Sequence, residues 1–144
     1  MPLDHQRSAG YMTNWAARAF TPAIERRLRH LGVAASYLPV FFALARSEEL
    51  AQKALAEAAG VDPSTMTLTL RRMVRDGLAE RRVDPDDRRS MLVSLSERGR
   101  RLLPEVKRAT DEVNTLALAP LAPEERDAFL ASLAKVVAAL ATDD

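Results

Sequence analysis

The sequence of 144 residues contains no cysteine, which excludes disulfide bonds, thiolate metal ligands and peroxide sensing by cysteine oxidation. It has only two histidines, His5 and His30, far apart in the chain, so we expect no dedicated zinc site. The five glycines are scattered, and none forms a loop that could cradle a phosphate. We therefore expect neither a metal nor a cofactor, and an enzyme only through a carboxylate site that no motif marks.

Long apolar runs are also absent. The longest one, residues 34–45, is interrupted by Ser36 and Pro39 and is too short to cross a bilayer. The first ten residues lack the basic, apolar and small-residue order of a signal peptide. With 47% hydrophobic residues, the chain has enough apolar surface for a real core. We therefore expect a globular protein of the cytoplasm that makes no contact with membranes.

The net charge of +1 hides an uneven distribution along the chain. Residues 64–108 hold twelve Lys and Arg against seven Asp and Glu, a local net charge of +5, and eleven of these twelve cations are Arg. Such a stretch favours contact with phosphates and bidentate recognition. A solvated face crossed by ion pairs has the same composition, so charge alone does not decide between the two interpretations.

Helical spacing marks the N-terminal part of the chain. Between residues 11 and 31 the pattern repeats every three or four positions, which predicts a helix that Gly32 ends. Thr21-Pro22 either kinks this helix or begins a second one. Ser36 is expected to cap a short helix that is buried on most sides.

The C-terminal part is also predicted to be helical. Ser96 is expected to cap a long helix that runs to about Leu118, with a kink at Pro104. A last amphipathic helix is expected after Pro123, with its apolar residues on one stripe.

Residues 52–76 predict a helix-turn-helix. An Ala-rich helix over 52–59 stops at Gly60, and Asp62-Pro63 begins a second helix that runs to Asp76. One face of the second helix is apolar, which leaves the other face for a DNA major groove. The candidate DNA-binding residues of this helix are Ser64, Thr65, Thr67, Leu68, Arg71, Arg72 and Arg75.

A hairpin is expected directly after this helix. Residues 78–83 and 91–95 predict two strands, and the Asp-Pro and acidic residues between them supply the turn. The tip adds three candidate DNA-binding residues, Asp87, Arg88 and Arg89. In an isolated hairpin these charges would be typical of a solvated turn, but after a helix-turn-helix they favour contact with DNA.

The segment "LAEAAGVDPSTMTLTLRRMVRDGLAERRVDPDDRRSMLVSLSERG" resembles the winged helix-turn-helix of the multiple-antibiotic-resistance regulator (MarR) family. Its most specific element is the Asp-x-Arg of the wing tip, Asp87-Arg88-Arg89. "VSLSERG" follows it, where the family commonly has Leu-Thr-x-x-Gly, and Ser96 replaces that Thr with the same capping chemistry. The resemblance extends over nearly the whole chain.

The resemblance implies a mainly α fold with a small β-hairpin wing. Residues 36–98 would form the winged helix-turn-helix lobe, and residues 1–35 and 99–144 a helical dimerisation region. It also implies a ligand-responsive DNA-binding regulator, expected to be a repressor, that binds a pseudo-palindromic operator as a homodimer. In this interpretation Arg89 reaches into a minor groove while Asp87 orients it.

A pocket for a small aromatic or phenolic effector, between the dimerisation helices and the winged lobe, is implied as well. Aromatic surface beside one cation suits an aromatic carboxylate, and the candidates are Tyr11, Trp15, Arg18, Tyr37 and Phe41. Ordinary interface packing explains Trp15 and Phe41 equally well. The alternative function is a winged-helix module for protein contacts or ligand binding with weak DNA affinity, against which the Arg-rich helix and wing argue.

Overall fold

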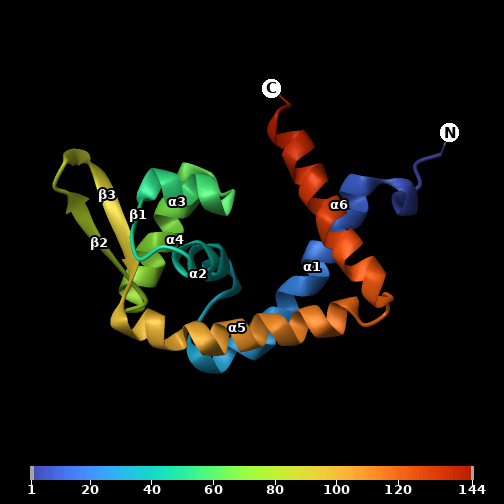
Figure 1. Cartoon of the computed structure of the whole chain (residues 1–144), viewed down its shortest axis with the longest axis horizontal. Coiled ribbons are helices and arrows are strands. Elements are labelled where there is room, and N and C mark those ends of the chain that lie inside the picture. The colour runs from blue at the N-terminus through green and yellow to red at the C-terminus, as the bar shows by residue number, and fades with distance from the viewer. Residues whose placement is uncertain (1, 144) are drawn as a thin grey trace. The chain divides into compact units, whose positions relative to one another are not determined.

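The computed structural model describes residues 2–143 and separates into two compact units, Met1–Thr110 and Asp111–Asp144. Six α-helices and three strands are present among these residues (Figure 1), which confirms the predicted fold class. They are α1 (Ala9–Leu28), α2 (Leu38–Leu44), β1 (Leu50–Ala51), α3 (Gln52–Ala59), α4 (Pro63–Arg75), β2 (Ala79–Asp84), β3 (Asp87–Leu95), α5 (Glu97–Leu118) and α6 (Pro123–Ala141). None of the described helices is both long and apolar enough to span a membrane.

Helix α1 begins where Ser8 accepts a hydrogen bond from the backbone N–H of Tyr11 at 3.2 Å. It continues through Pro22, so no second helix starts at this point. Thr21 does not act as a cap, because its hydroxyl donates to the carbonyl of Ala17 at 3.2 Å. A 3-10 turn follows α1, and Gly32 ends it in the left-handed conformation, as the sequence predicts.

The prediction that Ser36 caps α2 is wrong. Ser36 lies inside a 3-10 turn, Ala35–Tyr37, which leads directly into the helix, so Tyr37 occupies the N-cap position without a side-chain bond. The burial of Tyr37, which is 3% exposed, determines where α2 begins, and no capping hydroxyl is needed. The expectation of burial on most sides holds for Phe41, which is 1% exposed, but Phe42 is 59% exposed.

Helices α3 and α4 form the predicted helix-turn-helix. Gly60 closes α3 at φ +65°, a conformation that residues with a Cβ rarely adopt, and the N–H of Val61 donates to the carbonyl of Ala56 at 3.0 Å. Asp62 then caps α4 by accepting from the backbone N–H of Thr65 at 3.0 Å. The helix ends at Arg75, one residue before the predicted end.

The wing is the β2–β3 hairpin of a three-stranded antiparallel sheet with the order β1-β3-β2. Strand β3 begins at Asp87, four residues earlier than predicted, because backbone pairing continues through polar residues that show no apolar alternation. The turn is therefore shorter than expected, with Asp84 paired to Asp87. The sequence did not predict β1, since two residues are too few to show a strand pattern.

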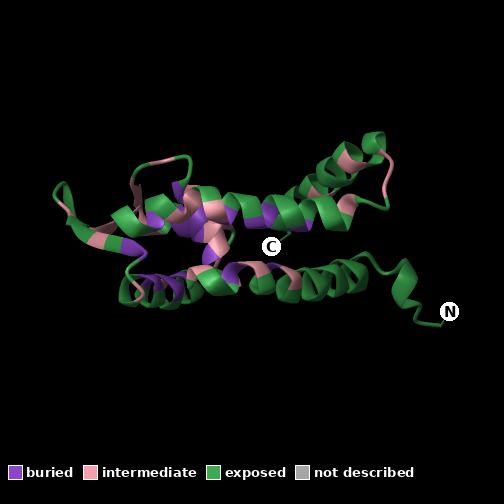
Figure 2. Ribbon diagram, turned by 90° about the horizontal axis from the view of Figure 1, so that it is seen from below, coloured by how far each residue is buried: buried purple, intermediate pink, exposed green. Residues whose placement is uncertain are grey.

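The core of the first unit lies among the end of α1, α2, α3, α4 and the sheet, where buried residues concentrate (Figure 2). Its fully buried large side chains are Leu28, Val40, Phe41, Leu55, Met66, Leu70, Met73, Leu78 and Val93. By contrast, α6 has no buried residue along its length.

The junction between β3 and α5 is tightly packed. As predicted, Ser96 caps α5, because its hydroxyl oxygen accepts from the N–H of Gly99 at 3.0 Å. The same hydroxyl donates to the carbonyl of Gly77 at 2.6 Å, which joins the end of the wing to the turn that follows α4. A Cβ on Gly99 would lie 2.3 Å from the carbonyl oxygen of Leu78, so only glycine fits at this position.

Candidate nucleic-acid interface

Helix α4 has one buried face and one exposed face. Met66, Leu70 and Met73 are at most 1% exposed, so they anchor the helix in the core. Of the seven candidate residues on this helix, six are exposed and Thr67 is partly buried. The Arg side chains and Leu68, which is 45% exposed, therefore lie on a surface that a groove of DNA could receive.

Two hydroxyl groups at the start of α4 are already engaged. Thr65 donates to the Oδ2 atom of Asp62 at 2.7 Å, as part of the helix cap. Thr67 donates to the carbonyl of Pro63 at 2.9 Å and accepts from the amide Nε2 of Gln52 at 3.1 Å. Gln52, on α3, thereby holds Thr67 in place, a role that its position at the start of a helix did not reveal.

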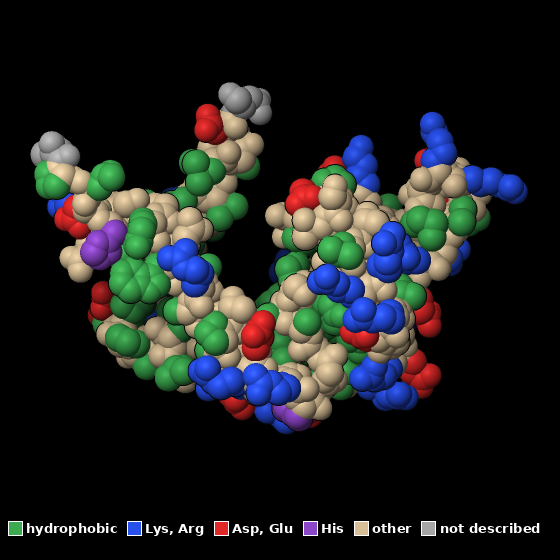
Figure 3. Space-filling model, turned by 180° about the vertical axis from the view of Figure 1, so that it is seen from behind, with side chains coloured by type: hydrophobic (Ala, Val, Ile, Leu, Met, Phe, Trp, Pro, Cys, Tyr) green, Lys and Arg blue, Asp and Glu red, His purple; other side chains and the backbone are tan. Residues whose placement is uncertain are grey.

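The arginine side chains at the tip of the wing are exposed to solvent (Figure 3). The side chain of Arg89 is 93% exposed, and Asp87 contacts both this side chain and the backbone of Arg89. The Oδ1 atom of Asp87 accepts from the backbone N–H of Arg89 at 3.1 Å and from its Nε at 3.4 Å. Asp87 thus contacts both the backbone and the side chain of Arg89, and Arg88 beside them is exposed as well.

A hollow of about 670 Å³ separates α4 from the wing. Its wall includes Thr67 of α4, Lys53 of α3, and Asp87 and Arg89 of the wing. Residues that the sequence assigned separately to two DNA-binding elements therefore border one concave surface. A basic side chain from each of two elements faces that surface, which suits a polyanion such as DNA.

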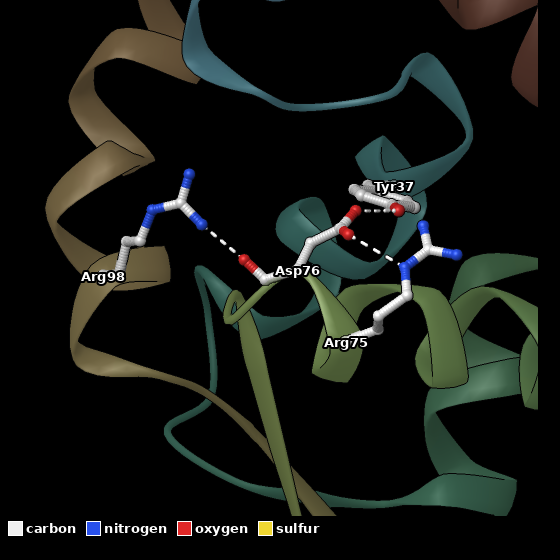
Figure 4. Close-up of polar contacts among 4 residues, drawn as sticks. All are labelled: Tyr37, Arg75, Asp76 and Arg98. Atoms are coloured by element: carbon white, nitrogen blue, oxygen red, sulfur yellow. Dashed lines mark hydrogen bonds and ion pairs between the residues drawn. The ribbon is translucent and has the colours of Figure 1, made fainter.

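Four residues meet at the C-terminal end of α4 (Figure 4). The hydroxyl of Tyr37 donates to the Oδ2 atom of Asp76 at 2.6 Å, and the Nε of Arg75 donates to its Oδ1 atom at 3.1 Å. Arg98 of α5 donates to the backbone carbonyl of Asp76. The bond from Tyr37, followed by that from Arg75, holds the pKa of Asp76 below its usual value.

The five candidate ligand residues do not form one site. Tyr11 and Trp15, on α1, are 51% and 49% exposed, and their rings pack edge to face at 6.1 Å between centroids. Arg18, on the same helix, is exposed. Tyr37 and Phe41 are buried instead, and the hydroxyl of Tyr37 is directed to Asp76.

A second cavity, of about 500 Å³, lies between α2 and the first half of α5. Phe41 is the one candidate ligand residue that lines it. The walls are mostly apolar, and two cationic side chains, Arg46 and Lys107, border them. Within residues 2–143, no group of three or more His, Cys, Asp or Glu side chains is placed to hold a metal ion.

Comparison with known proteins shows similarity to transcriptional regulators. A family model described as "MarR family" matches residues 31–90. An uncharacterized HTH-type transcriptional regulator of Mycobacterium bovis is 35% identical over 108 residues, which cover 75% of this chain and 75% of that protein. Another, from Bacillus subtilis, is 28% identical over 105 residues, which cover 73% of this chain but only 64% of the relative. These relatives are regulators and not enzymes.

Solved structures share the fold. The PcaV transcriptional regulator of Streptomyces coelicolor, in complex with its natural ligand, has a TM-score of 0.86 at 26% identity, covering 97% of this chain and 99% of that one. A mutant of MarR from E. coli, complexed with operator DNA, has a TM-score of 0.80 at 21% identity, covering 88% of this chain and 91% of that one, and shows the fold alone.

Proposed function

The chain belongs to the MarR family of DNA-binding transcriptional regulators, and on this premise we propose that it is a repressor that binds a pseudo-palindromic operator as a homodimer. The observation that carries this proposal is the concave surface shared by Thr67 of α4 and Arg89 of the wing. Both elements present exposed arginines, and the contact between Asp87 and Arg89 supports a role for Asp87 in orienting Arg89. We further propose that the regulator works in the cytoplasm, in contact with the chromosome.

We propose that the two DNA-binding elements read different grooves. The N-terminal half of α4 would enter the major groove with Ser64, Thr65, Thr67, Leu68 and Arg71. Arg72 and Arg75, nearer the C-terminal end of α4, would contact phosphates. Arg89 would enter the flanking minor groove, where a planar, weakly hydrated cation gains most. Arg88 would add a phosphate contact.

Dimerisation would cover apolar surface that the single chain leaves open. On α6, Leu130, Val137 and Leu140 are 54%, 68% and 67% exposed, an unusual amount for large apolar side chains of one helix. On α1, Tyr11 and Trp15 are about half exposed. We propose that residues 1–35 and 99–144 form the dimer interface and that Tyr11 and Trp15 pack within it, while residues 36–98 contact DNA. Two recognition helices would then address major grooves ~34–36 Å apart.

For the effector, we propose the cavity between α2 and α5. Its apolar wall, which includes Phe41 and Leu103, suits a hydrophobic body such as an aromatic ring. Arg46 and Lys107 at its border suit an acidic group on the same molecule. A small aromatic acid combines both features. The PcaV structure, solved with its natural ligand, supports ligand binding as a property of this fold.

The experiment that tests this function is a selection of bound fragments from the genome of the source organism. The purified chain of 144 residues should enrich one pseudo-palindromic sequence, and two chains should bind each copy of it. The alternative, a winged-helix module for protein contacts, predicts no enriched sequence and weak binding to any duplex. A selection that returns unrelated fragments, with one chain bound to each, would refute the repressor assignment.

A further inference from the structure

We propose that Tyr37 is a positioning residue for DNA recognition, because its hydroxyl, acting through the carboxylate of Asp76, fixes the guanidinium of Arg75 at the exposed end of the recognition helix. This inference rests on the proposed function, in which Arg75 contacts DNA. It gives Tyr37 a role different from the ligand contact that the sequence indicates.

The two oxygens of Asp76 have different partners, and this determines how the carboxylate is turned. Oδ2 accepts from Tyr37 at 2.6 Å, while Oδ1 accepts from Arg75 at 3.1 Å. The backbone of Asp76 is held separately, by Arg98 of α5. With both its backbone and one carboxylate oxygen held, Asp76 presents the second oxygen to Arg75 in a single orientation (Figure 4).

Burial decreases stepwise along this chain of contacts. Tyr37 is 3% exposed and belongs to the core, the side chain of Asp76 is 31% exposed, and that of Arg75 is 69% exposed. Tyr37, which the core holds in place, therefore lies inside the protein, and Arg75, which it positions through Asp76, lies at the surface. An exposed ion pair between neighbouring residues gives little order by itself, since solvent competes with it and both side chains lose rotamer freedom. The buried hydroxyl of Tyr37 holds the carboxylate of Asp76 in one orientation, and this in turn restricts the rotamers of Arg75.

Protonation favours this arrangement at neutral pH. Burial, and then the bond to Asp76, raises the pKa of Tyr37, so the phenol keeps the proton that it donates. The bonds from Tyr37 and Arg75 lower the pKa of Asp76, so the carboxylate remains charged and acts only as an acceptor. A positioned guanidinium loses less conformational freedom on reaching a phosphate than a mobile one does.

A double-mutant cycle tests this role. The proteins are the parent chain, Tyr37→Phe, Arg75→Ala and the double variant, and the probe is the operator duplex enriched from the genome. Tyr37→Phe should weaken operator binding roughly 3- to 10-fold in the parent background, the scale expected for releasing one side chain. In the Arg75→Ala background the same change should have an effect of less than about 1.5-fold, because no guanidinium remains to be positioned.

Controls separate positioning from folding. The melting temperature of each variant, measured alongside its affinity, shows whether the folded chain is retained. If Tyr37→Phe unfolds the chain, Asp76→Asn provides the same test, since it keeps the shape of the side chain but weakens the pair with Arg75. Equal losses in the parent and Arg75→Ala backgrounds would overturn the inference while leaving the proposed function intact. A parent chain that selects no operator would overturn both.

Discussion

Replacing Arg89 with alanine removes the side chain on which the DNA-binding interpretation of the wing depends. This side chain is 93% exposed and contacts Asp87 of the same hairpin, so its loss opens no cavity. The melting temperature should therefore hardly change, because exposed substitutions usually alter stability by less than about 0.5 kcal/mol. An Arg that reads a groove contributes roughly 1–3 kcal/mol per half-site, and a dimer makes the contact twice.

The expected loss of operator affinity is therefore about 2–6 kcal/mol, or from about 30-fold to about 10⁴-fold. Fluorescence anisotropy with a labelled operator and a random duplex, at one fixed salt concentration, measures it directly. The matched control is Arg101→Ala on α5, which removes the same charge from a side chain that is 68% exposed and paired with Glu97. If Arg89→Ala binds the operator as the parent does, the wing is a solvated turn and the reasoning fails. Asp87→Ala should weaken binding less than Arg89→Ala does, since it removes both an orienting group and a charge that repels phosphates.

Four further predictions concern specificity, packing, assembly and pH. Thr67→Ala and Arg71→Ala should relax base preference at major-groove positions, as a repeated selection would show, and an unchanged preference would remove them from the readout. Gly99→Ala should lower the free energy of unfolding in urea by about 1–3 kcal/mol, because its Cβ would overlap the carbonyl of Leu78, and an unaltered midpoint would contradict this packing. Deleting residues 1–31 removes the fully buried Leu28 together with part of the proposed dimer interface, so sedimentation of the shortened chain should show aggregates. A folded monomer that binds DNA would argue against the dimer. The lowered pKa of Asp76 means that its stabilising effect is present above its unfolded pKa and is lost as the pH falls through the folded pKa. Asp76→Asn should therefore lose less of its free energy of unfolding than the parent does as the pH falls. Equal losses of unfolding free energy in the two proteins would exclude this contribution.

Those parts of the molecule that depend on short spacings are predictable from the sequence. Gly60 and Asp62 mark the turn of the helix-turn-helix because each acts on backbone within a few residues, and the structure places both as expected. Ser96 is predictable for the same reason. Asp87 and Arg89 are two residues apart, and their contact follows from that spacing once the hairpin forms.

Contacts between distant segments are not predictable in this way. Tyr37 and Asp76 are 39 positions apart, and no pattern around either residue indicates that the fold brings them together. Similarly, Gln52 meets Thr67 only because α3 and α4 pack against each other. Ser36 has the side chain that favours a cap, but burial of the neighbouring Tyr37 determines where the helix begins. The sequence likewise groups four aromatic residues and one cation as ligand candidates, of which Phe41 alone lines the cavity between α2 and α5.

The salt dependence of operator binding tests the central claim, that exposed arginines on α4 and the wing bind DNA from two copies of the chain. Each neutralised phosphate contributes about −0.9 to the slope of log K against log salt concentration. If each copy makes at least three phosphate contacts, the slope for the parent should be about −5 or steeper. Arg72→Ala should make this slope shallower by about two units, because each of the two copies loses one phosphate contact. A slope near zero for the parent chain, on the operator and on random duplex alike, would contradict the account.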